Sequence, residues 1–195
     1  MQAAGGASLS DADHEVTSHP RRWPVFAAVA LVGLAVDQIS KAWVVANWTN
    51  DTELIGSLLT LHLTYNPGAA FSTGTRFTLL ISCVAVVATV VVSWFGLRVR
   101  DRIWALGLGL LFAGVAGNLC DRLFRSPGPM RGHVVDFLQL PNWPIFNIAD
   151  ICINIAAGII IVQSLRGVQM DGRRAESDRT PAHDGDGRAD GSERA

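Results

Sequence analysis

Charged side chains are scarce in this chain. Asp, Glu, Lys and Arg make up only 17% of its 195 residues, and the formal net charge at pH 7 is −1. The arginines lie in short groups beside apolar runs and do not form one basic face. Because nucleic-acid binding needs a strong positive field, this balance argues against a nucleic-acid partner.

Cysteine and histidine are also few and poorly placed for chemistry. Cys83, Cys120 and Cys152 lie in or beside apolar runs without Cys-x-x-Cys spacing, so we expect small core residues. Three of the five histidines lie in polar end segments, and the other two are isolated. Gly-x-Ser-x-Gly, His-Glu-x-x-His and phosphate-loop motifs are absent from the sequence. We therefore expect neither a metal nor a cofactor.

Long apolar runs are what the sequence does contain. Phe77–Leu97 is a 21-residue run without a charge, and Ile103–Cys120 is another of 18. Each is close to the roughly 20 residues that cross the hydrocarbon core of a bilayer. We predict an all-α integral membrane protein with four transmembrane helices, at about 24–45, 77–97, 103–121 and 145–165. A small extracytoplasmic β-rich portion is predicted between the first two helices.

The arginines predict how these spans are oriented. Eight lie near span ends on one side of the membrane: Arg21, Arg22, Arg98, Arg100, Arg102, Arg166, Arg173 and Arg174. Four lie on the other side: Arg76, Arg122, Arg125 and Arg131. The side richer in Arg and Lys is usually cytoplasmic, so both termini are predicted to be cytoplasmic.

The two ends of the chain differ from its middle in composition. Residues 1–22 are rich in Ala, Gly, Ser, Asp and His, and residues 167–195 in Arg, Asp, Gly and Ser, without an apolar periodicity. Both are predicted to be disordered cytoplasmic segments. Residues 23–166 are predicted to form one membrane domain.

The segment between the first two spans has the pattern of a strand. Leu59, Leu61, Leu63 and Tyr65 alternate with polar residues, which predicts a strand with one apolar face. The Asn66-Pro67-Gly68 sequence that follows predicts a turn.

Polar residues inside the spans follow helical spacing. Asp37 and Lys41, four residues apart, share a face of the first span, so they can pair while Lys41 extends towards the membrane interface. In the third and fourth spans, small and polar residues recur along one face of each, namely Gly107, Gly114, Asn118 and Asp121, and Asn147, Asp150, Asn154 and Gly158. Two stripes that meet near the outer leaflet predict an interior polar site.

Two acids stand out at this level. Asp136 is predicted in the outer loop and Asp150 at the outer end of the fourth span, at the same membrane depth. Two carboxylates held close cannot both ionise cheaply, so one becomes a base while the other stays an acid. Such a pair can activate a water and protonate a leaving amine, as peptide hydrolysis requires. The predicted chemistry is aspartic proteolysis at the membrane surface.

Two other functions fit a polar membrane bundle. Buried Asp and Asn residues line the path of a small transporter or proton-conducting subunit, but here they concentrate near the outer ends of the spans, so no continuous path is predicted. The other alternative is a four-helix scaffold whose charges only fix its packing.

Five short motifs occur in order along the chain: Asp37-Gln38-Ile39-Ser40-Lys41, Asn66-Pro67-Gly68-Ala69-Ala70-Phe71-Ser72, Gly117-Asn118-Leu119-Cys120-Asp121-Arg122, Val134-Val135-Asp136-Phe137 and Phe146-Asn147-Ile148-Ala149-Asp150. Through them the chain resembles the lipoprotein signal peptidase (type II signal peptidase) family over roughly Val25 to Leu165. The resemblance implies an aspartic endopeptidase of the bacterial cytoplasmic membrane, with its active site near the outer face. It would remove signal peptides from prolipoproteins, cutting just before a cysteine that carries diacylglyceryl.

The resemblance implies that Asp136 and Asp150 are the catalytic pair and that Asn147 steadies Asp150. Further roles are implied around them: Asn118, Asp121 and Arg122 brace the site, Asp37 and Lys41 tie the first helix to the extramembrane portion, and Asn66 with Gly68 binds substrate backbone. Asp121 is the rival for a catalytic place, but Arg122 and Asn118 beside it would hold it ionised, and an ionised carboxylate cannot act as the acid. A monomer is expected because one chain supplies the whole site.

Two departures from the family pattern are visible. Residues Ala113-Gly114-Val115 stand where the family commonly has Gly-Gly-Ala, and Arg125 to Arg131 forms a longer loop that contains proline. Neither change removes an acid, although the second alters the expected access of substrate.

Overall fold

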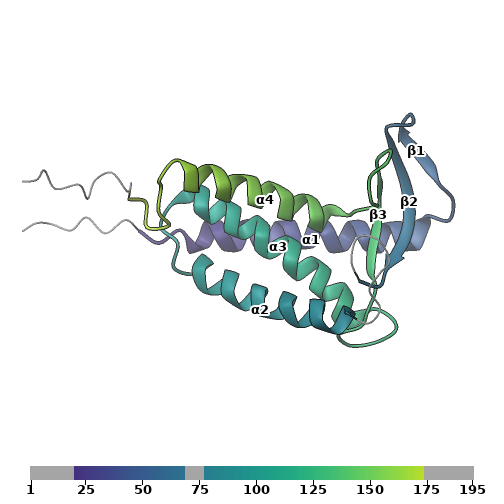
Figure 1. Cartoon of the computed structure of the whole chain (residues 1–195), viewed down its shortest axis with the longest axis horizontal. Helices are drawn as coiled ribbons and strands as arrows, with labels where there is room; N and C mark the ends of the chain where they lie inside the picture. Colours follow the sequence, from purple (N-terminus) through teal and green to yellow (C-terminus); the bar gives the residue numbers. More distant parts are fainter. Residues whose placement is uncertain (1–19, 69–76, 174–195) are drawn as a thin grey trace, which may run out of the picture.

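The computed structural model of the chain describes residues 20–68 and 77–173. The elements within these ranges are α1 (Trp23–Asn47), β1 (Thr52–Ile55), β2 (Leu59–Asn66), α2 (Thr78–Gly96), α3 (Arg102–Phe124), β3 (Val134–Gln139) and α4 (Ile148–Leu165). The helices lie side by side in a bundle, and the strands stand across one end of it (Figure 1). We call this the sheet end. The start of α1 and the end of α4 lie at the opposite end, which we call the far end.

All four helices are long and apolar enough to cross a membrane, with lengths of 18 to 25 residues. Two ends differ from the predicted spans by three residues, more than any of the others. Helix α3 continues to Phe124 instead of ending at 121, and α4 begins at Ile148 instead of 145. The later start of α4 has a local cause, because the Asn147 side chain accepts a hydrogen bond from the Asp150 backbone and caps the helix there.

Helix α3 is the centre of the bundle. It packs against α1, α2 and α4, and 50% of its span is buried, against 17 to 22% in the other helices. Small residues allow this closeness, since a Cβ on Gly109 would overlap Val29 of α1 and one on Gly114 would overlap the Ala149 carbonyl of α4. In contrast, α2 is the least buried helix, and its Cys83 is exposed instead of being the predicted core residue.

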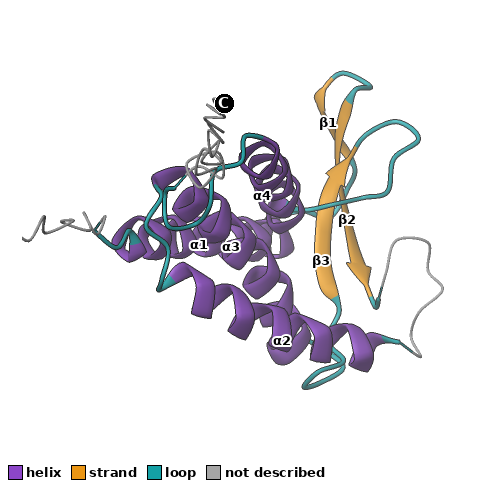
Figure 2. Cartoon of the chain, turned by 60° about the vertical axis from the view of Figure 1, so that its left-hand side comes forward, coloured by secondary structure: helices purple, strands orange, loops and turns teal. Residues whose placement is uncertain are grey.

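The three strands form one antiparallel sheet in the order β1-β2-β3. The β-rich portion was predicted between the first two helices, but β3 comes from the connection between α3 and α4. It pairs with β2 so that Asp136 lies opposite Thr64, and it is the strand nearest the helices (Figure 2). A buried cluster joins the sheet to α1, formed by Val44, Leu61, Val135 and Phe137. The sheet therefore holds Asp136 against the bundle.

The chain after α4 turns back onto the start of α3. The Arg100 backbone N–H donates to the Met170 carbonyl at 2.9 Å, and Trp104 Nε1 donates to the Val168 carbonyl at 2.9 Å. The flexible tail was predicted to begin at residue 167, so the structure moves this boundary beyond residue 170. The rest of the two predicted tails, residues 1–19 and 174–195, lies outside the described residues.

Candidate active site

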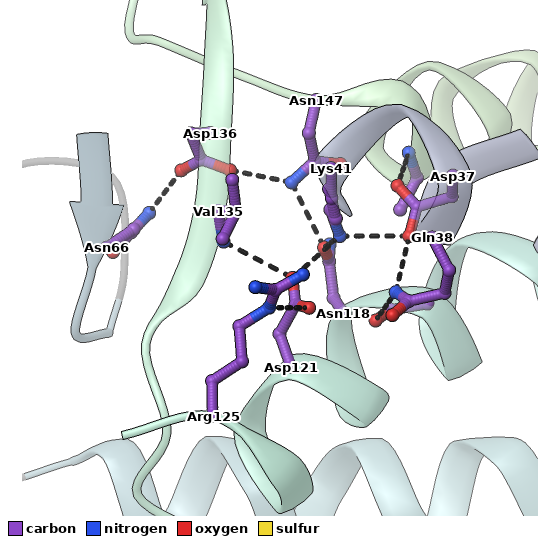
Figure 3. Close-up of polar contacts among 12 residues, drawn as sticks. Asp37, Gln38, Lys41, Asn66, Asn118, Asp121, Arg125, Val135, Asp136 and Asn147 are labelled. Atoms are coloured by element: carbon purple, nitrogen blue, oxygen red, sulfur yellow. Dashed lines mark hydrogen bonds and ion pairs between the residues drawn. The ribbon is translucent and has the colours of Figure 1, made fainter. Parts of the chain in front are cut away.

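Asp136 is buried on β3 and accepts hydrogen bonds from two side-chain amides. Asn66 Nδ2, at the end of β2, donates to Oδ2 at 3.0 Å, and Asn147 Nδ2 donates to Oδ1 at 2.6 Å (Figure 3). Asp136 as a whole is only 3% exposed to solvent. Such a site satisfies both oxygens while keeping bulk water away.

Asp150 lies in the first turn of α4 and is half-buried. Its Oδ2 accepts from the Asn147 backbone N–H at 3.1 Å, while its own N–H donates to Asn147 Oδ1 at 3.1 Å. This reciprocal pair is a capping box, which fixes the start of the helix. Asn118 Nδ2 of α3 donates to the other oxygen, Oδ1, at 2.9 Å. Each carboxylate oxygen of Asp150 thus accepts one hydrogen bond, from the Asn147 backbone and from the Asn118 side chain.

The two acids are therefore joined through one residue. Asn147 contacts Asp136 with its side chain and Asp150 with its backbone, and the three belong to β3 and the start of α4. Burial raises the pKa of the Asp136 carboxyl from 3.8 to about 6, and the negative charge of Asp150 adds to this rise, against the opposing pull of the Asn66 and Asn147 amides. The structure brings together the two acids that the sequence singled out and gives them unlike surroundings.

Lys41 is wholly buried beneath this pair. Its Nζ lies 2.9 Å from Asp37 Oδ2 and 2.8 Å from Asp121 Oδ2, and it donates to Asn118 Oδ1 at 3.0 Å (Figure 3). The prediction that Lys41 extends towards the membrane interface is wrong, because the side chain is 0% exposed. Two carboxylates and an amide oxygen replace the water that the ammonium would otherwise need.

Asp37 was predicted to tie the first helix to the extramembrane portion, and the structure gives it a different partner. Its Oδ1 accepts from the Ala149 backbone N–H at 2.9 Å, in the first turn of α4. The neighbouring Gln38 donates from Nε2 to Asp37 at 3.0 Å and to the Gly117 carbonyl of α3 at 3.0 Å. The polar face of α1 therefore joins α3 and α4 to each other, and neither of these bonds reaches the sheet.

Asp121, the rival acid, is held by other groups than those predicted. It contacts Lys41 as described, accepts from Arg125 Nε at 2.6 Å, and accepts from the Val135 backbone N–H at 3.2 Å (Figure 3). Arg122 and Asn118, which were expected to hold its charge, make none of these bonds. Two cations, Lys41 and Arg125, nevertheless contact its carboxylate, and the bond to Val135 fixes β3 beside Asp136.

Arg122 is 8% exposed, and its Nη1 has no hydrogen-bond partner among the residues that the structure describes. The charges of Asp136, Asp121 and Asp150 all act on this guanidinium. A buried donor without a partner is costly, so it marks a place where a ligand oxygen would be stabilised.

Asn66 and Gly68 were predicted to contact substrate backbone. Asn66 Nδ2 is bonded to Asp136, and its Oδ1 accepts from the Gly68 N–H at 3.0 Å. The remainder of that motif, from Ala69 onwards, lies outside the described residues. A substrate contact by these two residues stays a prediction.

Part of the predicted polar stripe on α4 does not face the site. Asn154 and Gly158 are exposed, and Asn154 Nδ2 donates only to the Asp150 carbonyl, at 2.8 Å.

Three residues of the network had no predicted role: Gln38, Gly117 and Arg125. Only Arg125 carried a usable signal, because it follows Asp121 by four residues on one helix. Across residues 20–68 and 77–173, no group of three or more His, Cys, Asp or Glu residues is placed to hold a metal ion.

Comparisons with known proteins give one consistent result. The family model described as signal peptidase (SPase) II matches residues 29–166. A lipoprotein signal peptidase from Leifsonia xyli is 46% identical over 153 residues, covering 77% of this chain and 71% of that protein. One from Rhodococcus jostii is 45% identical over 159 residues, covering 80% of each. A solved structure of a bacterial membrane enzyme has the same fold, with a TM-score of 0.66 at 24% identity, over 76% of this chain and 97% of that one.

Proposed function

Because this chain belongs to the signal peptidase II family, we propose that Asp136 and Asp150 are its catalytic acids. The protein is an aspartic-type peptidase that removes signal peptides from prolipoproteins. The assignment of the acids rests on one observation, that both accept hydrogen bonds from Asn147. Its Nδ2 donates to Asp136 Oδ1 at 2.6 Å, and its backbone N–H donates to Asp150 Oδ2 at 3.1 Å. One residue thus sets the position of both carboxyl groups relative to a substrate.

The unlike surroundings of the two acids favour a division of roles. Asp136, with its pKa raised to about 6, is the group that holds a proton and acts as the acid. Asp150, at the helix N-terminus, is the base. It takes a proton from a water whose oxygen bonds to the scissile carbonyl carbon. Asp136 gives its proton to the leaving nitrogen as the C–N bond breaks.

Arg122 can donate a hydrogen bond to the carbonyl oxygen of the same peptide bond. Its Nη1 is buried without a partner among the described residues, and its charge lies in the field of both acids. Negative charge develops on the carbonyl oxygen during attack, and a preorganised donor in a dry site stabilises it. We assign Arg122 to this oxygen, while Lys41, Asp37 and Asp121 position the helices around the acids.

The finer description of substrate and orientation is also a proposal. We infer that the substrate cysteine carries diacylglyceryl, that the cut falls just before it, and that the enzyme acts as a monomer. The sheet end would lie at the outer face of the bacterial cytoplasmic membrane, with both termini cytoplasmic. The described arginines support this, with seven at the far end (Arg21, Arg22, Arg98, Arg100, Arg102, Arg166 and Arg173) and three at the sheet end (Arg122, Arg125 and Arg131).

A transporter or proton-conducting subunit receives no support from the buried polar groups. Apart from Gln163, the buried polar side chains of the described residues lie in the half of the bundle nearest the sheet, and they are Asp37, Lys41, Thr78, Ser82, Asp121, Arg122, Asp136 and Asn147. A conduction path would need such groups along the whole span.

Single substitutions test the catalytic assignment. Asp136→Asn and Asp150→Asn are each expected to lower cleavage of a lipid-modified precursor by about 100-fold or more, the usual contribution of an acid or base. Asp51→Asn is the control, because Asp51 is an exposed carboxylate at the same end of the molecule, paired only with His62. Asp121→Asn should retain cleavage in the fraction that folds. Normal cleavage by a folded, membrane-inserted Asp136→Asn or Asp150→Asn enzyme would remove that residue from the mechanism.

A further inference from the structure

A groove lies on the surface of α3 and α4 at the far end, away from the acids. Its volume is about 360 Å³, and its walls are mainly apolar, with Ile103 from α3 and Ile159 and Val162 from α4. Gln163 and Arg166, at the end of α4, also line it. The groove is thus apolar along its length and polar where the helix ends.

Gly158 opens one wall of this groove. A Cβ added there would meet nothing within 4 Å, and the residue is exposed. Gly114 on α3 differs, because a Cβ there would overlap α4. Gly158 therefore does not serve helix packing, and it leaves bare backbone facing open space in the groove.

Gln163 supplies a second and independent observation. Its side chain is 2% exposed, and its Oε1 has no hydrogen-bond partner among the described residues. The orientation of the amide is fixed, because Nε2 donates to Asp101 Oδ1 at 3.2 Å, and this carboxylate can only accept. Oε1 is thus a buried acceptor, on a residue that lines the groove, and it lacks a donor among the described residues, which is costly unless a ligand supplies one.

The charges around the groove favour an anion. Arg166 has no carboxylate partner among the described residues, while six further arginines lie at this end, as given above. The acids that face them are already engaged: Asp101 accepts from the Ile103 and Trp104 N–H groups as the cap of α3, and Asp171 lies 3.7 Å from Arg173. The positive charge of Arg166 therefore remains available at the mouth of the groove.

We propose that this groove binds one anionic phospholipid whose headgroup carries a hydroxyl, as in phosphatidylglycerol. The phosphate lies at Arg166, a headgroup O–H donates to Gln163 Oε1, and an acyl chain lies along Ile159 and Val162 over Gly158. The site is at the opposite end from Asp136 and Asp150, so it is separate from the place of cleavage. It would hold the far end of the bundle at the charged surface of one leaflet.

Lipid binding to the purified full-length protein in detergent micelles tests this proposal. Native mass spectrometry with phosphatidylglycerol and phosphatidylcholine is expected to show tighter binding of phosphatidylglycerol. Gly158→Leu should lose most of this binding by filling the groove, and Arg166→Gln should weaken it about fivefold. The matched controls are Ala157→Leu, at an exposed neighbouring position outside the groove, and Arg98→Gln, whose guanidinium lies over Trp94 at the same end. Both should bind as the wild type does.

Several results would overturn the proposal. Equal binding of both lipids, or wild-type binding by Gly158→Leu, would show that the groove is not the proposed lipid site. An equal loss in Arg98→Gln and Arg166→Gln would indicate a diffuse charge effect. Dimers that Gly158→Leu dissociates would show that a second copy occupies the groove. The measurement does not use cleavage, so it is independent of the proposed catalytic roles.

Discussion

Asn147 donates a 2.6 Å hydrogen bond to Asp136 with the same side chain whose oxygen caps the helix that carries Asp150. These two tasks use different atoms, Nδ2 and Oδ1. Position 147 therefore contributes both to the start of α4 and to the ionisation of Asp136. A substitution that keeps one atom and removes the other can separate the two.

Asn147→Ser is such a substitution. Serine keeps an oxygen that can cap α4, so stability should change by about 1 kcal/mol or less. Loss of the donor removes a bond to ionised Asp136 and raises the pKa of its carboxyl further above about 6. Because the acid must be protonated, kcat/KM falls as the pH rises past this pKa, and in the variant this decline should move to higher pH. Asn154→Ser on the same helix is the control. An unchanged pH profile in Asn147→Ser would contradict the role of the Asn147 amide.

The raised pKa of Asp136 also predicts how stability depends on pH. The folded protein binds this proton up to about pH 6 and the unfolded chain only up to about 3.8, so the wild type loses stability as the pH rises between these values. The loss amounts to about 3 kcal/mol by pH 7. Asp136→Asn lacks it, so its stability relative to the wild type should improve by about 2.5 kcal/mol, most of that loss, from pH 4 to pH 7, whatever the constant offset. Unfolding midpoints in detergent at both pH values measure the change, and a constant difference would contradict it.

Gly117 of α3 is the point of closest approach to the polar face of α1. A Cβ there would lie 2.5 Å from Asp37 Oδ2, a carboxylate already held by Lys41 and the Ala149 N–H. Gly117→Ala is therefore expected to destabilise the protein by about 1 to 3 kcal/mol. Gly158→Ala is the matched control, because its Cβ meets open space and alanine favours helix by about 1 kcal/mol. Thermal unfolding should thus shift in opposite directions for the two variants, and equal shifts would contradict the packing argument.

Local patterns were sufficient to predict much of the fold. The four helices follow from apolar runs of membrane length, and β2 from the alternation of leucines with polar residues. The small residues predicted on α3 do face neighbouring helices at Gly107 and Gly114. These features depend only on neighbours in sequence, which is why a single chain reveals them.

The parts that could not be predicted depend on partners distant in the sequence. Nothing local to Lys41 indicates that its second carboxylate is Asp121, and nothing local to Val134–Gln139 indicates pairing with β2. The prediction of which face of α4 points inward was wrong for a related reason. The buried seam runs through Ala149, Cys152, Ala156 and Gln163, whereas the predicted stripe lies about 180° around the helix, on nearly the opposite face. Only Asn147 and Asp150, near the helix start, reach the site from that stripe.

Lys41 gives the sharpest test of the buried network, because its removal leaves two carboxylates, Asp37 and Asp121, at 0% side-chain exposure without their common cation. Lys41→Met is expected to cost about 3 to 5 kcal/mol. Arg125→Gln, which removes the 26% exposed partner of Asp121, should cost less, about 1 kcal/mol.

The cycle with Asp37→Asn then separates charge from packing. Alone, Asp37→Asn breaks a buried ion pair and should destabilise the protein, but in the Lys41→Met background it removes an unpaired charge and should restore stability. Unfolding midpoints of the four proteins in detergent measure this coupling. Simple additivity would mean that Lys41 and Asp37 do not share a charge interaction, and the electrostatic account of the α1–α3–α4 junction would then fail.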